Sequence, residues 1–133
     1  MSAIEIDTRK SVDVIDITAL VQQQLQESGL ESGICLVYTF HTTTGLTVNE
    51  ADNALIQDIL GLLEKLAPVG AGYRHDRSDG NAHAHLRATL LGNSVVIPFE
   101  NYKLLLGTWQ RILFFELDGP RRRTLQCKAI PDR

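Results

Sequence analysis

Hydrophobic positions alternate with polar ones near the start of the chain and then recur at helical spacing. Residues 3–7 alternate apolar and polar side chains, which predicts a strand with one face in water. Residues 12–15 predict a second short strand. The apolar stripe that follows predicts a helix, capped by Asp16 or Thr18 and ended by Gly29.

The middle of the chain predicts two strands around one strongly apolar helix. Residues 33–40 are almost all apolar and β-prone, which indicates a central strand, and residues 46–49 indicate a short one. Leucine and isoleucine recur at helical spacing over residues 51–67, and Pro68 limits this helix. Residues 69–81 combine glycines with polar side chains, which predicts a long loop of the kind that often carries function.

Residues 82–91 fit two structures. Their alternation of apolar and polar side chains is a strand pattern, but Asn81 and Gly92 suit the two ends of a helix, so we expect a helix. The choice matters for His83 and His85. Side chains two positions apart share one face of a strand but point about 200° apart on a helix, so only one of them would bind a given ion.

The last third of the chain completes an α+β pattern. It predicts strands at residues 94–99, about 103–106 and 109–117. A turn at residues 118–120 then leads to a final strand at residues 121–130. The sum is about three helices and seven or eight strands without regular βαβ alternation. We therefore expect one compact α+β domain over residues 1–133, with a mainly antiparallel sheet.

Composition narrows the class of protein and its partners. Hydrophobic residues make up 44% and charged residues 22%, as in an ordinary globular protein, which excludes a disordered or fibrous chain. The net charge of −3 favours neither nucleic acid nor an anionic membrane. Cys35 and Cys127 lie in apolar runs without metal or redox spacing, which predicts two reduced, buried thiols. With no secretion signal at the start, we expect a cytoplasmic protein.

The four histidines fall in two polar, loop-centred regions, and this clustering favours a shared site over scattered surface residues. A catalytic Zn²⁺ takes about three imidazole or carboxylate ligands plus water. The candidate ligands are His41, His75, one of His83 and His85, and Glu50 or Asp76.

Two further stretches hold candidate binding residues. Three threonines and Gly45 follow His41, and their hydroxyls and N–H groups would hold an anion, with Glu50 as a base or an orienting group. The alternative is a threonine-rich turn that bonds its own backbone. Trp109, beside Gln110, would stack on a heteroaromatic ligand or else fill the core.

Arginines follow the turn at residues 118–120. If a strand begins at Arg121, then Arg121 and Arg123 share a face and would grip a phosphate. The alternative is a solvated basic edge that discourages strand pairing. The chain lacks the glycine-rich motifs of nucleotide hydrolysis and dinucleotide redox, and the serine motif of common esterases.

Several unusual stretches, taken in order, resemble one known family, the YjbQ family, often labelled secondary thiamine-phosphate synthases. The matching stretches are His41-Thr42-Thr43-Thr44-Gly45-Leu46-Thr47-Val48-Asn49-Glu50, Tyr73-Arg74-His75, Gly80-Asn81-Ala82-His83-Ala84-His85-Leu86, Leu91-Gly92-Asn93-Ser94, Leu106-Gly107-Thr108-Trp109-Gln110 and Glu116-Leu117-Asp118-Gly119-Pro120-Arg121. The resemblance implies a homotrimer with a histidine-lined pocket at or near the subunit interface, often holding a metal ion.

The resemblance also implies site residues. They are Glu50, His41 and His85 for catalysis, Thr43, Thr44, Asn81, Trp109, Gln110, Arg121 and Arg123 for a phosphorylated small-molecule substrate, and His41, His75 and His85 for a metal. His83 is a weaker candidate. Tyr102 stands where the family commonly has glycine, and because tyrosine disfavours positive φ, we expect this loop to differ.

The family label implies a condensation in which a pyrimidine-methyl diphosphate loses pyrophosphate to the attacking nitrogen of a thiazole phosphate. Arg121 and Arg123 would hold the diphosphate, and Trp109 the pyrimidine. A diphosphate favours magnesium, whereas three histidines favour zinc and an activated water, hence hydrolysis. The alternatives are therefore a metal-dependent hydrolase of a phosphorylated metabolite, with Glu50 as base, and a non-catalytic trimeric metal- or metabolite-binding protein.

Overall fold

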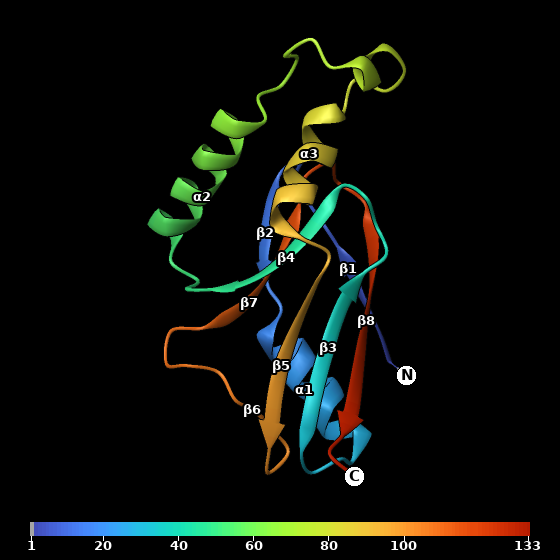
Figure 1. Ribbon diagram of the computed structural model, residues 1–133, viewed down its shortest axis with the longest axis vertical. Coiled ribbons are helices and arrows are strands. Elements are labelled where there is room, and N and C mark those ends of the chain that lie inside the picture. The colour runs from blue at the N-terminus through green and yellow to red at the C-terminus, as the bar shows by residue number, and fades with distance from the viewer. Residues whose placement is uncertain (1) are drawn as a thin grey trace.

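A computed structural model describes residues 2–133, which form two antiparallel sheets and three α-helices (Figure 1). The strands are β1 (Ser2–Asp7), β2 (Asp13–Asp16), β3 (Gly33–Thr39), β4 (Thr44–Asn49), β5 (Ser94–Glu100), β6 (Lys103–Leu104), β7 (Arg111–Glu116) and β8 (Arg122–Pro131). The helices are α1 (Thr18–Ser28), α2 (Asn53–Leu66) and α3 (Ala82–Leu91), with a 3₁₀ turn, η1 (Arg74–Arg77). The expected α+β domain with a mainly antiparallel sheet is confirmed.

The larger sheet has the order β1-β8-β3-β5-β6 and the smaller one the order β2-β7-β4. Every described strand pair is antiparallel, and β3 lies in the middle of the larger sheet, as its apolar sequence predicts. The pairing of β1 with β8 brings residues from the two ends of the chain side by side (Figure 1).

The main core lies between the inner face of the larger sheet and α1. Inward-facing side chains of β3 and β8, such as Val37 and Leu125, are fully buried with Val21 and Leu25 of α1. Burial of each such side chain contributes about 1.5–3 kcal/mol to folding. The outer face of β3 is not covered in this way, so its side chains remain partly exposed.

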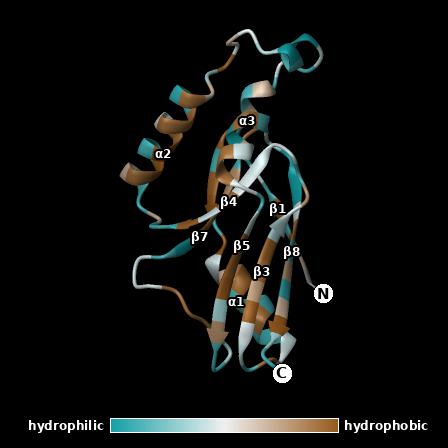
Figure 2. Ribbon diagram, in the orientation of Figure 1, coloured by the Kyte–Doolittle hydropathy of each residue, from teal (hydrophilic) through white to brown (hydrophobic). Residues whose placement is uncertain are grey.

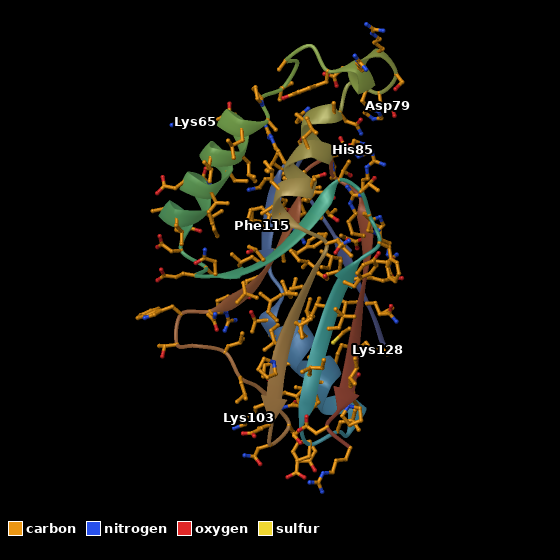
Figure 3. The ribbon with its side chains drawn as sticks, in the orientation of Figure 1. Lys65, Asp79, His85, Lys103, Phe115 and Lys128 are labelled. Carbon is orange, nitrogen blue, oxygen red and sulfur yellow. The ribbon has the colours of Figure 1, made fainter. Side chains whose placement is uncertain are left out.

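A smaller core joins α3, α2 and β7. Phe115 of β7 (Figure 3) is fully buried. It packs with Ala84 of α3, and Leu63 is the one buried residue of α2. Ile59 and Leu60 of α2 pack partly against this core, but the other side of the helix carries apolar side chains outward, with Leu62 and Leu66 more than half exposed (Figure 2). The described helices include none long and apolar enough to cross a membrane.

The helix ends follow local hydrogen bonding. Asp16 Oδ1 accepts from the backbone N–H of Thr18 at 3.0 Å at the start of α1, and Gly29 ends the helix with φ 70°. The helical interpretation of residues 82–91 is confirmed. The side chain of Asn81 does not cap it, however, because its amide bonds His75 and Asp118 instead, while Asp76 Oδ1 accepts from the N–H of Ala82 at 3.0 Å.

The strand β4 begins two residues earlier than expected, because Gly45 is part of the strand rather than of a turn. A Cβ atom at Gly45 would lie 2.6 Å from Cβ of Leu91. The glycine therefore lets α3, the helix that carries His83 and His85, pack directly on β4.

In the hairpin between β5 and β6, Tyr102 adopts the positive φ that a tyrosine side chain disfavours. Asn101 and Tyr102 both adopt positive φ, 51° and 65°, as in the tight turn that normally takes glycine at its second position. The backbone N–H of Tyr102 donates to the carbonyl of Glu31 at 3.0 Å, and Gln22 Nε2 donates to the carbonyl of Tyr102 at 2.8 Å. These two hydrogen bonds hold Tyr102 in a backbone conformation that tyrosine disfavours.

Candidate functional site

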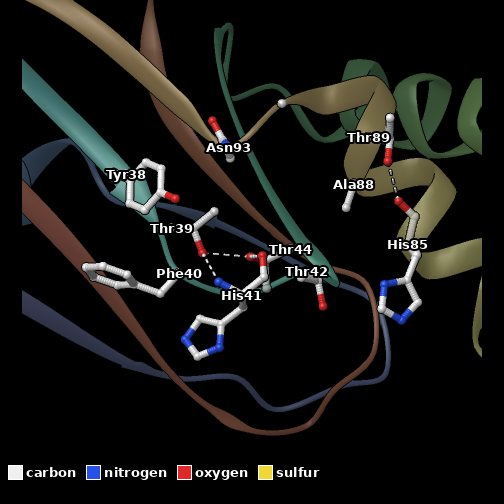
Figure 4. Close-up of a pocket in the computed structure, with 11 residues that line it drawn as sticks. Tyr38, Thr39, Phe40, His41, Thr42, Thr44, His85, Ala88, Thr89 and Asn93 are labelled. Atoms are coloured by element: carbon white, nitrogen blue, oxygen red, sulfur yellow. Dashed lines mark hydrogen bonds between the residues drawn. The ribbon is translucent and has the colours of Figure 1, made fainter.

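Two adjoining cavities open where β3 passes into β4 beside α3 (Figure 4). The larger has a volume of about 560 Å³ and the smaller about 260 Å³. Both are lined by Phe40, His41, Thr42 and His85, so they form one site with two ends. Figure 4 places His41 and His85 on opposite sides of it, one after β3 and the other on α3.

The orientation of His41 is set by the neighbouring strand. The backbone N–H of Thr124 donates to Nε2 of His41 at 2.8 Å. Only an unprotonated ring nitrogen can accept this bond, which assigns the proton of the neutral ring to Nδ1. Burial and the positive charge of Arg123 lower the pKa of His41 below its usual value, so the ring is neutral at pH 7 and offers Nδ1–H as a donor.

Behind His41, Arg123 and Glu116 form a buried ion pair. Nε of Arg123 donates to Oε1 of Glu116 at 2.7 Å and Nη2 donates to Oε2 at 2.5 Å, with exposed fractions of 4% and 0%. The hydroxyl of Thr8 and the backbone N–H of Asp118 also donate to this carboxylate. Although burial opposes ionisation, the bonds from Arg123 and Thr8 hold the pKa of Glu116 below its usual value.

The two arginines expected to bind phosphate, Arg121 and Arg123, line the same cavity but differ in exposure. Nη2 of Arg123 donates to the hydroxyl of Thr43 at 2.8 Å while Glu116 balances its charge. Arg121 lies just before β8 and is mostly exposed; its Nε donates to the backbone carbonyl of Asp118 at 2.9 Å and its Nη2 to Oδ2 of Asp118 at 3.2 Å. Arg121 is therefore the more accessible cation of the site.

The three threonines after His41 differ in burial. Thr43 and Thr44 are buried: Thr43 accepts from Arg123, and the Thr44 hydroxyl lies 2.7 Å from that of Thr39. Thr42 is exposed and lines both cavities. The hydroxyl placed to meet a ligand is thus that of Thr42, whereas the resemblance implied Thr43 and Thr44.

Asn81 connects the loop before α3 to the turn before β8. Its Nδ2 donates to Oδ2 of Asp118 at 2.9 Å, and its Oδ1 lies 3.0 Å from Nε2 of His75. An amide oxygen only accepts, so His75 carries a proton on Nε2. The rings of His75 and His85 meet edge to face with centroids 4.8 Å apart, which brings three expected site residues together.

The expected histidine ligands do not form a metal site within one chain. Over residues 2–133, no group of three His, Cys, Asp or Glu side chains is arranged to hold a metal ion. His75 and His85 are neighbours, but the Nε2 lone pair of His41 is already used by Thr124. The donor set of a single chain therefore does not fit the implied metal. His85 lines both cavities and His83 lines neither, as the helical spacing predicts.

Glu50 and Trp109 lie elsewhere on the chain. They line a separate cavity of about 340 Å³, together with Asp52 and Arg111. Trp109 is 70% exposed, so it does not fill the core. Oε1 of Gln110 accepts from the N–H of Gly107 at 2.8 Å and closes the turn that presents the indole ring.

Two aromatic residues at the larger cavity went unnoticed in the sequence. Tyr38 and Phe40 both line that cavity, with ring centroids 5.2 Å apart in an edge-to-face arrangement. Tyr38 is on β3 and Phe40 follows its last residue, so their two-residue spacing is a signal that alternation could have supplied. The role of Glu116 had no local signal, because its partner arrives on a different strand.

The whole chain matches one family. The family model described as UPF0047 protein YjbQ-like matches residues 2–132. A UPF0047 protein of Archaeoglobus fulgidus is 57% identical over 92% of this chain and 95% of its own length. The UPF0047 protein YugU of Bacillus subtilis is 40% identical over 98% of both chains.

Solved structures agree with these sequence matches. A YbjQ-like protein from Sulfolobus solfataricus, described as of unknown function, superposes with a TM-score of 0.95 at 37% identity over 98% of this chain and 96% of that one. An uncharacterised YjbQ/UPF0047 family protein from Clostridium acetobutylicum gives 0.92 at 44% identity over 98% of this chain and 100% of that one. Matches of sequence and fold over nearly every residue show that the chain belongs to the YjbQ/UPF0047 family.

Proposed function

We propose that the site binds a phosphorylated heteroaromatic metabolite, and that the chain is a transferase of the thiamine-phosphate-synthase type its motifs resemble. One observation carries this: a single site has aromatic side chains at one end and an accessible arginine at the other. Tyr38 lines the larger cavity alone, Arg121 lines the smaller alone, and Phe40, His41 and His85 line both.

The arginine end suits a phosphate or diphosphate. Arg121 offers a planar set of donors, and its two hydrogen bonds to Asp118, from Nε and Nη2, leave other N–H groups for an anion. The exposed hydroxyl of Thr42 and the Nδ1–H of neutral His41 add uncharged donors. These uncharged donors add hydrogen bonds to the anion, and they avoid the free-energy cost of burying a second positive side chain beside Arg121.

The aromatic end suits a flat heterocycle. The rings of Tyr38 and Phe40 give the larger cavity an apolar wall on which a pyrimidine would pack, replacing the role first expected of Trp109. The volume of about 560 Å³ is within the range of small-molecule sites.

The reaction needs stabilisation of a leaving group more than proton transfer. The thiazole nitrogen attacks the methylene carbon with its lone pair while the carbon–oxygen bond to the diphosphate breaks, and pyrophosphate leaves with both bonding electrons. Negative charge grows on the leaving oxygen, where Arg121 and His41 Nδ1–H would donate hydrogen bonds. Diphosphates commonly carry magnesium, so Mg²⁺ is a condition of the assay.

We further propose a cytoplasmic homotrimer in which the Glu50 and Trp109 surface of one copy approaches the histidine site of the next. The 70% exposure of Trp109, the uncovered apolar side chains of α2 and the open outer face of β3 support assembly. A neighbouring copy would also supply carboxylate ligands to His75 and His85, which a single chain does not complete for zinc.

Pyrophosphate release from a pyrimidine-methyl diphosphate and a thiazole phosphate tests the proposed activity. We expect turnover by the wild type with Mg²⁺, and a loss of about tenfold or more in Arg121→Ala, because a hydrogen bond to a charged group is removed. Arg122→Ala is the matched control, since Arg122 is exposed on the next residue and pairs with Glu5 instead. Release of orthophosphate would indicate the hydrolase, and binding without turnover the non-catalytic alternative; either result overturns the transferase.

A further inference from the structure

The two cysteines of the chain meet inside the main core, although they are 92 positions apart in the sequence. Sγ of Cys35 in β3 and Sγ of Cys127 in β8 are 3.3 Å apart. The register places Cys127 opposite Val37 and Cys35 opposite Ala129, so the cysteines are diagonal neighbours on the same inner face. The pairing of β3 with β8 therefore creates a dithiol that the separate sequence runs do not reveal.

The two thiols differ in access. Cys35 is fully buried, whereas Cys127 is 5% exposed and lines a cavity of about 370 Å³. Glu27 of α1, Leu30 just after it and Lys128 of β8 form other parts of its wall. A small molecule in this cavity reaches Cys127 before Cys35.

The contact also differentiates the two thiols chemically. The hydrogen bond from Cys35 lowers the pKa of Cys127 below its ordinary value. The bond to Cys127, together with burial, raises the pKa of Cys35. Because the thiolate is the reactive form, the thiol nearer to the cavity is also the stronger nucleophile.

We propose that Cys35 and Cys127 form an oxidation site that hydrogen peroxide converts into an intramolecular disulfide. The sulfur of Cys127 attacks one peroxide oxygen, the O–O bond breaks, and the departing hydroxide takes the Cys127 proton to become water. The sulfur of Cys35 then attacks the resulting sulfenic acid, the S–O bond breaks, and a second water leaves with the Cys35 proton. Two thiols are oxidised and one peroxide is reduced to two waters.

The dithiol lies on the same two strands that hold the histidine site. β3 leads directly to His41, and β8 carries Arg123 and Thr124, which contact the site. Forming the bond requires the sulfurs to approach from 3.3 Å to about 2.05 Å. A disulfide therefore fixes the β3–β8 pairing that orients His41.

The test uses the reduced full-length chain and hydrogen peroxide, followed by intact mass and non-reducing peptide mapping. We expect a mass loss of about 2 Da with disappearance of both free thiols, since two hydrogens leave. We also expect one cross-linked peptide joining Cys35 to Cys127, reversal by dithiothreitol, and a rise in Tm on the order of 10 °C. If the folded wild type keeps both thiols, or forms only links between chains, the oxidation site does not exist.

Single variants test the assigned order of attack. In Cys35→Ser, Cys127 should stop at a sulfenic acid that dimedone traps, because the resolving thiol is missing. In Cys127→Ser, Cys35 should react with peroxide at least about tenfold more slowly than Cys127 does in Cys35→Ser, because Cys35 is fully buried. Equal rates in the two variants would overturn the assignment of Cys127 as the attacking thiol. If either variant fails to fold, trapping the first adduct in the wild type with dimedone and mapping its position gives the same answer.

Discussion

Arg123 and Glu116 bind each other through two hydrogen bonds in the interior, directly behind the proposed ligand site. Arg123 also donates a hydrogen bond to Thr43. Its positive charge lowers the pKa of His41 although the arginine itself is buried. A buried pair of this kind is often less stabilising than apolar residues of the same size, yet removing one partner is costly. We interpret it as a device that holds the ends of β7 and β8 in one arrangement.

Glu116→Gln should lower the free energy of unfolding by about 3–5 kcal/mol, because Arg123 is left as an unbalanced buried charge. Urea denaturation followed by circular dichroism measures this. Glu5→Gln is the control: it removes a carboxylate that pairs with Arg122 on the surface, where the expected change is within about 1 kcal/mol. Similar losses in the two variants would show that burial of the pair has no special effect.

The same carboxylate predicts a dependence of stability on pH. The pKa of Glu116 is lowered in the folded chain, so the unfolded chain takes up a proton first as the pH falls. Its contribution is present above the unfolded value of about 4.3 and is lost as the pH falls through the folded value. Denaturation midpoints measured from pH 6 downward should fall more steeply for the wild type than for Glu116→Gln; parallel curves would contradict this.

His41 should titrate below the ordinary histidine range, because burial and Arg123 disfavour its charged form. Stability is then unaffected by this group above the unfolded pKa of about 6.5 and decreases as the pH falls from there toward the folded value. Nitrogen NMR of the ring should show a protonated Nδ1 and an accepting Nε2 at pH 7, with His41→Gln used for assignment. A protonated Nε2 would contradict the bond from Thr124.

Sequence patterns predicted the elements well but the site only in part. A nearly continuous apolar run located β3 and helical spacing located α2, whereas α3 was expected from Asn81 and Gly92 at its two ends, against an alternation that favoured a strand. Long-range relations leave no such trace: the pairing of β3 with β8 joins the two cysteines, and the buried partner of Arg123 lies on β7. The sequence placed Gly45 in a turn. Its close approach to Leu91, which requires a residue without a side chain, is visible only in the packed structure.

Trp109 should report assembly through its fluorescence, since it is the only tryptophan of the sequence and is 70% exposed in the single chain. A proposed trimer that buries it should shift its emission to shorter wavelength as the protein concentration rises. Trp109→Ala should abolish that assembly in sedimentation analysis while changing chain stability by about 0.5 kcal/mol or less, as for an exposed residue. A wild type that sediments as a monomer with exposed-type emission would contradict the trimer.

Gly45→Ala should displace α3, because the added Cβ would lie 2.6 Å from Cβ of Leu91. We expect a loss of about 1–3 kcal/mol in the free energy of unfolding and weaker ligand binding, since α3 carries His85 to the cavities. Adding Leu91→Ala removes the clashing atoms beyond Cβ and should recover part of the loss.

The matched control for this substitution is Gly61→Ala in the middle of α2. A Cβ atom there meets nothing within 4 Å, so alanine should stabilise the helix by about 0.5–1 kcal/mol. The two glycines thus predict opposite signs for one chemical change, which denaturation of the two variants measures directly. If Gly45→Ala were as well tolerated as Gly61→Ala, α3 would not rest on β4 through the glycine, and the placement of His85 beside His41 would have to be revised.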